Sequence, residues 1–163
     1  MRLAELPEGG ALDLGHGVRA ICEYGLIRFV TSSEADAAPE PVSLRIPGSC
    51  RFGRWEVRAE VCPAPVEPAG PDLATLDAGA LGEELLVRTW REGDRMRPLG
   101  MKGSKTLQDL FTDRGVPRSL RHHLPVVTAA GHVVWVAGVA VSEDFRLGSQ
   151  ANAVAVLTAR VLD

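Results

Sequence analysis

This chain of 163 residues has little cysteine, few aromatic residues and almost no lysine. Its three cysteines, Cys22, Cys50 and Cys62, are far apart and form no CxxC pair. That spacing argues against a disulfide framework and against a zinc site built from closely paired ligands. No apolar run approaches the roughly 20 residues that span a bilayer, and the start lacks the layout of a signal peptide. We therefore expect free thiols in a cytoplasmic protein with no membrane segment.

Positive charge is concentrated in one quarter of the chain. Residues 86–125, called the basic segment below, carry nine Arg or Lys and four Asp or Glu, a net charge of +5, whereas the rest of the chain sums to −8. Charge gathered in this way favours a surface directed at an anionic partner. A solvated face without a partner is the alternative, because runs of charge are often no more than that.

Two patterns in the basic segment resemble known sites but fail on spacing. GMKGSKT is close to a phosphate-binding P-loop, but Ser104 separates Gly103 from Lys105, and a required upstream glycine is a proline. His122 and His123 are adjacent, and neighbouring residues of a helix point about 100° apart, so both cannot easily bind one metal ion. No Ser-His-Asp or Cys-His arrangement stands out by spacing. We therefore expect no catalytic group, cofactor site or metal site in this chain.

The first part of the chain predicts a β-rich connecting segment over residues 1–62. Tyr24-Gly25 is expected to be the turn of a hairpin within residues 11–31, and Pro47-Gly48 the turn of a second strand pair. Alternating side chains predict the strands, at residues 18–22, 26–30, 42–46 and 55–61. Residues 63–72 hold four prolines, too many for a strand or helix, so we place a linker and the domain boundary there.

Residues 73–163 predict an α+β domain with a mostly antiparallel sheet and a short helix pair. A second helix is expected between Pro117 and Pro125. The first helix is marked by a cap, apolar residues at i, i+3 and i+4, and a terminating glycine: Ser104 or Thr106, then Leu107, Leu110 and Phe111, then Gly115. Strands are expected at residues 85–90, 126–129, 132–141 and 153–162.

The cations of the basic segment suit a phosphodiester backbone better than one small ligand, because they spread over about 30 residues. Glycine-containing loops and a helix start also let backbone N–H groups approach phosphates. Asp94 and Asp109 are interpreted as organisers of nearby arginines and of the helix start, not as an acid–base pair. The candidate contacts fall on a strand end and loop, on a second loop, and on a helix face: Arg88, Arg91, Arg95 and Arg97; Lys102 and Lys105; Arg118 and Arg121.

At these same positions the chain resembles the C-terminal domain of bacterial tRNA(Ile)-lysidine synthetases. Four runs carry the resemblance in order: VRTWREGDRMRPLG at 87–100, GSKTLQDLFTD at 103–113, VPRSLRHHLPVV at 116–127 and WVAG at 135–138. Residues 12–29 are more weakly similar to the stretch that precedes this domain in the family. The resemblance implies a fold that is also similar to a domain of the phenylalanyl-tRNA synthetase beta subunit.

The resemblance further implies a role in one tRNA modification. The family uses ATP to ligate lysine to the wobble cytidine of an isoleucine tRNA with a CAU anticodon, through an N-terminal PP-loop domain with an SGGxDS motif. The C-terminal domain binds the tRNA, largely at the acceptor stem. This chain contains no SGGxDS. The resemblance thus implies a tRNA(Ile)-binding part, residues 73–163, that is inactive alone, with ATP and magnesium used by a catalytic domain in cis or in trans.

By position, the eight cations named above carry over as candidate tRNA contacts, and Trp135 and the apolar residues of the first helix as core. Two other functions remain open. The basic segment could dock an acidic protein surface, such as a separate catalytic subunit. An independent small-molecule enzyme is disfavoured, because neither a nucleophile–base pair nor a metal set can be named.

Overall fold

The computed structural model describes residues 8–15, 18–23, 26–31, 38–63, 73–148 and 152–162. Two larger β-sheets, a small three-stranded sheet and a two-stranded ribbon make up these parts of the chain, and every described strand pair is antiparallel. The helices are short: α2 (Ala78–Leu81), α3 (Leu107–Asp113), α4 (Arg118–Arg121) and a 3-10 helix, Glu143–Phe145. The expected class, mostly antiparallel β with a short helix pair, is confirmed.

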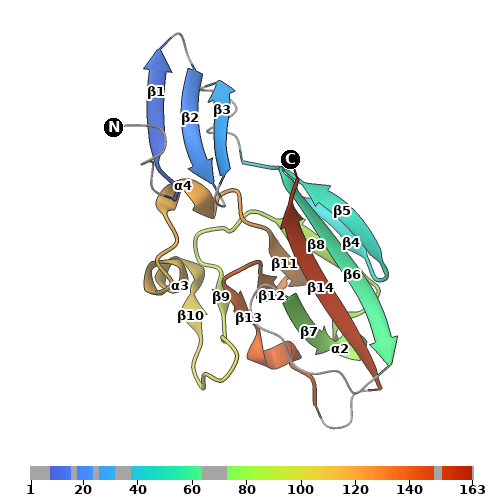
Figure 1. Cartoon of the computed structure of the whole chain (residues 1–163). Helices are drawn as coiled ribbons and strands as arrows, with labels where there is room; N and C mark the ends of the chain where they lie inside the picture. Colours follow the sequence, from blue (N-terminus) through green and yellow to red (C-terminus); the bar gives the residue numbers. More distant parts are fainter. Residues whose placement is uncertain are drawn as a thin grey trace.

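The two larger sheets share the body of the molecule (Figure 1). The five-stranded sheet has the order β13-β12-β11-β8-β4: Ala140–Val141, His132–Val136, Val126–Ala129, Glu84–Arg88 and Val42–Arg45. The four-stranded sheet has the order β5-β6-β14-β7: Gly48–Phe52, Trp55–Pro63, Ala153–Val161 and Leu73–Asp77. The remaining strands are β9 (Arg95–Met96) and β10 (Lys105–Thr106), which form the ribbon.

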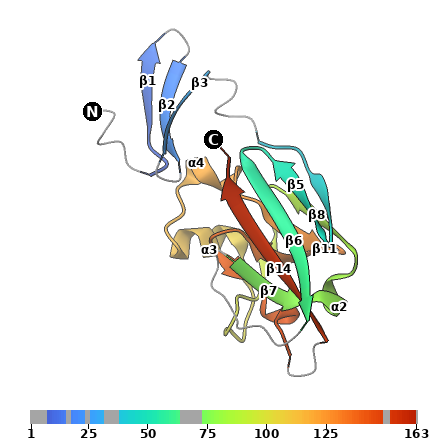
Figure 2. The same ribbon diagram turned by 45° about the vertical axis from the view of Figure 1, so that its right-hand side comes forward.

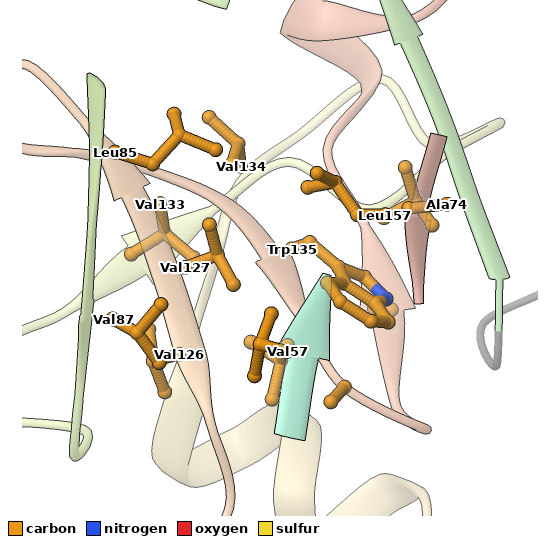
Figure 3. Packing of buried hydrophobic residues seen from close by; sticks show 14 of the residues in the cluster. Val57, Ala74, Leu85, Val87, Val126, Val127, Val133, Val134, Trp135 and Leu157 are labelled. Carbon is orange, nitrogen blue, oxygen red and sulfur yellow. The ribbon is translucent and has the colours of Figure 1, made fainter. Parts of the chain in front are cut away.

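One hydrophobic core joins the two larger sheets. Trp135 of β12 is fully buried and lies with Val57 of β6 and Leu157 of β14 (Figure 3). Strand β11 is buried along its whole length, as a strand is when both of its faces are covered. Leu107 and Phe111, on one face of α3, reach the same core, which fixes α3 against the sheets because burial of each such side chain contributes roughly 1.5–3 kcal/mol.

The expected boundary at residues 63–72 does not separate the strands into two bodies. Strand β4 pairs with β8, and β6 pairs along its whole length with β14 at the other end of the chain. Pro63 is the last residue of β6, whereas residues 64–72 lie outside the described part of the chain. Residues 42–63 therefore belong to the same two sheets as the residues that follow, because their hydrogen-bond partners lie there.

Residues 8–31 contribute a separate small sheet, β1-β2-β3, with β1 Ala11–Gly15, β2 Val18–Glu23 and β3 Leu26–Thr31. The expected hairpin is its second half, while its turn, Tyr24-Gly25, lies outside the described residues. The sheet stands at one end of the molecule beside α4 (Figures 1 and 2). There Ser119 Oγ of α4 donates a hydrogen bond to the carbonyl of Gly9 at 2.7 Å. The residues just before β1 are therefore bonded to α4.

The structure shows which residue caps α3 and differs from the sequence prediction at two places in the strands. Thr106, not Ser104, caps α3 by accepting a hydrogen bond from the Asp109 N–H at 3.1 Å. The strand expected at 132–141 is broken into β12 and β13 by a turn in which Gly138 has φ of 73°. Pro47-Gly48 was expected to join two paired strands. Instead, the strands on either side of it, β4 and β5, belong to different sheets, and β5 pairs with β6.

Candidate nucleic-acid interface

Arg88, expected to face a nucleic acid, is buried in an ion pair with Asp94. Its Nη1 and Nη2 donate to the two carboxylate oxygens of Asp94 at 2.8 and 2.9 Å, and Nη1 also donates to the carbonyl of Thr89 at 3.0 Å. The side chains are only 7% and 13% exposed. The interpretation of Asp94 as an organiser is therefore confirmed, and Arg88 is its partner, not a surface contact.

The contacts with Arg88 and Arg91 also lower the pKa of the Asp94 carboxyl. Burial on its own would raise the pKa of this carboxyl, but hydrogen bonds from Arg88 and from the Arg91 amide, together with the charges of both arginines, outweigh burial and hold the pKa below its ordinary value. The Arg91 N–H donates to Asp94 at 2.7 Å. Asp94 thus stays charged at neutral pH and closes the turn that follows β8.

Three further cations of the basic segment are engaged within the molecule but remain at its surface. Arg97 pairs with Asp144 at 2.6 Å, with its side chain 38% exposed, and Lys105 pairs with Asp113. Arg95 donates through Nη2 to the side-chain oxygen of Ser104 at 3.1 Å, which braces the loop between β9 and β10. These pairs are exposed and individually weak, so an incoming phosphate could compete for the same cations.

Four exposed cations of the basic segment have neither an ion pair nor a side-chain hydrogen bond among the described residues: Arg91, Lys102, Arg114 and Arg118. They lie after β8, in the β9–β10 loop, at the end of α3 and at the start of α4. These elements gather on the side of the molecule away from β4 and β5 (Figure 1). We call the four residues the outward cations. Arg114 was not among the candidates from the sequence, although its place behind an amphipathic helix was a usable signal.

A surface hollow of about 310 Å³ lies beside this group, and we call it the Trp90 hollow. It joins the loop after β8 to helices α3 and α4. Two cations, a carboxylate, an amide and two ring systems line it: Arg118, Arg121, Glu92, Gln108, Trp90 and His122. Sequence reasoning named its arginines but not the rings, because nothing in the spacing of Trp90 and His122 shows that the fold brings them together.

Aromatic contacts hold the wall of the Trp90 hollow. The Trp90 ring meets Phe111 edge-on, with centroids 5.7 Å apart and an interplanar angle of 81°, and lies 5.8 Å from the His122 ring at 33°. Arg121 sits over the Phe111 ring at 5.6 Å, while its Nε donates to the Val116 carbonyl at 3.0 Å. Arg121 is therefore partly structural, whereas Arg118 is exposed.

The structure also bears on the cysteines, on metal ligands and on the P-loop-like run. Cys22, Cys50 and Cys62 form no disulfide, as expected, and burial raises the pKa of Cys50. Within the described ranges no three His, Cys, Asp or Glu residues gather as a metal site would require. In the P-loop-like run, Lys105 is bound to Asp113 rather than directed into a loop of amides. No helix in the described parts is long and apolar enough to cross a membrane.

Comparison with known proteins gives one consistent family. Residues 85–157 match the model of the TilS substrate C-terminal domain. A tRNA(Ile)-lysidine synthase of Symbiobacterium thermophilum is 40% identical over 156 residues, which cover 90% of this chain and 32% of that protein. One from Geobacter sulfurreducens is 43% identical over 75 residues, 46% of this chain and 16% of that protein. The chain thus spans a third or less of the length of these relatives.

Comparison of the fold with solved structures points to the same family. A crystal structure of a TilS C-terminal domain matches this chain with a TM-score of 0.66 and 26% sequence identity. The match covers 76% of this chain and 99% of that domain. Since almost the whole solved domain is matched, its architecture is contained in this chain, and the matched family residues include the basic segment from Leu86 onward.

Proposed function

Because the chain belongs to the family of tRNA(Ile)-lysidine synthase C-terminal regions, we propose that it is a tRNA-docking module that binds the acceptor stem. One observation carries the proposal: the outward cations are exposed, and the helices and ribbon that carry or flank them lie on one side of a protein with a net charge of −3 (Figure 1). Cations that are not neutralised internally are the ones that release counterions when they meet phosphates. Arg95, Arg97 and Lys105, whose partners are exposed, would add to this surface.

In the whole enzyme, this module would hold tRNA(Ile) while a catalytic domain ligates lysine to the wobble cytidine in the cytoplasm. ATP and magnesium would bind to that domain, in cis or in trans. In this proposal the residues described here position the tRNA, and among them no three His, Cys, Asp or Glu residues gather as a metal site would require. Phosphate contacts fix the register of a bound nucleic acid without reading its sequence, so the module on its own would discriminate weakly between tRNAs.

Equilibrium binding followed by fluorescence anisotropy tests this proposal. The ligands are isoleucine tRNA with a CAU anticodon, an unrelated tRNA and a duplex DNA, each at two salt concentrations. We expect salt-sensitive binding in which both tRNAs exceed the duplex DNA, because the surface would fit an RNA helix. Absence of binding at low salt, or equal binding of the DNA, would contradict the proposal.

A second candidate function rests on a different surface. The small sheet exposes large apolar side chains on β1 and β3, namely Leu14, Leu26, Ile27 and Phe29, the last of them 59% exposed. Exposed apolar patches often mark protein contacts, so this sheet would dock a protein, such as the catalytic domain of the same enzyme. Titration with the N-terminal part of the Symbiobacterium relative tests this, since Phe29→Ser should weaken that binding and leave tRNA binding unchanged.

A further inference from the structure

The Trp90 hollow has features that the docking of a double helix does not require. A phosphate backbone needs exposed cations, whereas this hollow adds two ring systems and two hydrogen-bonding side chains to its arginines. Its volume of about 310 Å³ lies at the lower end of the range for small-ligand sites. It is therefore large enough for one flat group and too small for a helix.

Trp90 is held for its ring rather than for its hydrogen bond. The indole Nε1 is covered from solvent and has no hydrogen-bond acceptor among the residues that the structure describes. Buried polar groups are usually partnered, so this placement costs stability. Phe111 fixes the indole edge-on from one direction, and the His122 ring lies tilted beside it, which leaves aromatic surface at the wall of the hollow.

The loop that carries Trp90 is tied down on both sides. The Arg88–Asp94 pair closes the turn around it, and Thr89 Oγ1 donates to the His122 carbonyl at 2.9 Å. The loop after β8 and the end of α4 are thus joined by a hydrogen bond across 33 residues of sequence. Such ties reduce the ordering cost of binding because the walls of the site are already in place.

The polar lining has the chemistry of nucleotide recognition. Arg118 offers a guanidinium to a phosphate, whereas Arg121 lies over the Phe111 ring and is bonded through Nε to Val116, with no hydrogen bond from its Nη groups to the part of the chain that the structure describes. Gln108 can both donate and accept, and Glu92 can accept, at the edge of a base. Rings that stack a base beside arginines that hold its phosphate are the usual means of binding an unpaired nucleotide.

We propose that the Trp90 hollow binds an unpaired nucleotide from the 3′ single strand of the tRNA acceptor end. This inference rests on the proposed function, which brings the acceptor stem to this surface. Bases inside the stem are stacked and paired, so they cannot enter a hollow, whereas the unpaired 3′ nucleotides next to it can. His122 and Trp90 would contact the base, and Arg118 its phosphate.

Two forms of the same tRNA test the proposal, one intact and one trimmed of its unpaired 3′ nucleotides. The wild-type chain should bind the intact tRNA about tenfold more tightly, the scale of one base stacked on an aromatic ring. His122→Ala should remove most of that preference while binding the trimmed tRNA as the wild type does. His123→Ala, at the neighbouring position outside the hollow, is the matched control and should keep the preference.

His122→Phe separates stacking from charge, because it keeps a ring and removes the imidazole nitrogens, and it should retain most of the preference. Equal binding of both RNAs by the wild type would overturn this inference while leaving the proposed function intact. A full preference in His122→Ala would also overturn it. Failure to bind either RNA would overturn the proposed function as well, so the two failures are distinguishable.

Discussion

Arg88 and Asp94, six residues apart, form a bidentate ion pair that is almost fully withdrawn from solvent. The pair divides the basic segment into two kinds of cation. Arg88 is buried and shapes the turn, whereas Arg91, three residues further along, has an exposed side chain and is bonded to Asp94 through its backbone N–H. The positive charge of a sequence segment is therefore an upper limit on the charge that its surface can offer a partner.

Asp94→Asn should lower the free energy of unfolding by about 3 kcal/mol, because it leaves the buried Arg88 charge without a counter-charge. Asp113→Asn is the matched control, since the Lys105–Asp113 pair is exposed at both side chains and should contribute less than about 1 kcal/mol. Urea unfolding of the three proteins at neutral pH measures both values. Equal losses in the two variants would show that the Arg88–Asp94 pair is not the structural element we take it for.

The stabilisation from Asp94 should depend on pH in a defined direction. Its pKa in the folded chain lies below the ordinary value of 3.8, so the folded state favours the charged form. The contribution is fully present above about pH 5, where Asp94 is ionised in both the folded and the unfolded chain, and is lost as pH falls through the lowered pKa. The difference in unfolding free energy between wild type and Asp94→Asn should therefore be constant from pH 7 to 5 and shrink below pH 4. A difference that does not change down to pH 3 would contradict this.

Gly9→Ala should loosen the small sheet from α4 without disturbing the core. Gly9 has φ of +76°, and a Cβ there would lie 2.5 Å from Cβ of Pro117. Gly15→Ala is the control, because Gly15 has φ of +85° but open space around it, so it carries the backbone strain without the clash. Amide hydrogen exchange at Cys22, whose N–H donates to the Gly10 carbonyl, should quicken much more in Gly9→Ala. Equal exchange in the two variants would refute the contact.

Removing the cap of α3 should have a modest, local cost. Thr106→Ala loses the hydrogen bond to the Asp109 N–H and should destabilise the chain by about 1 kcal/mol. Thr112 is a control on the same helix, because its hydroxyl donates to the Gln108 carbonyl within the helix and such back-bonding stabilises little. Thr112→Ala should therefore be close to neutral. Thermal unfolding of both variants decides whether the cap contributes as the geometry implies.

The elements that sequence analysis identified correctly are those specified by neighbouring residues. Helix α3 has its cap, its i, i+3 and i+4 apolar face and its terminating glycine within ten residues, so local chemistry determines it. The sheet to which each strand belongs, in contrast, depends on residues far apart in the sequence. The pairing of Glu56 with Arg160 joins residues 104 positions apart, and no composition pattern in residues 63–72 reveals that the strands on either side of them share sheets.

The candidate site shows the same limit. Charge density located the segment that carries the outward cations, and the order of residues in the basic segment gave the resemblance to the family. Burial, however, depends on packing, so Arg88 and Arg91 could not be told apart by residue type. The Trp90 hollow could not be predicted either, since Trp90 and His122 meet only after β8 and α4 pack together. Arg114, exposed at the end of α3, lies behind an amphipathic pattern that is visible in the sequence.

The central claim is that the outward cations bind tRNA phosphates, and the slope of log affinity against log salt concentration measures it most directly. Each phosphate contact contributes roughly 0.7–0.9 to that slope, so combining Arg91→Gln, Lys102→Gln and Arg118→Gln should reduce it by about 2 to 3. Arg45→Gln is the control and should leave the slope unchanged, because Arg45 is exposed on β4, a strand on the opposite side of the molecule from α3 and α4 (Figure 1). An unchanged slope in the triple variant would mean that the tRNA, if bound, meets another surface, and would contradict the account.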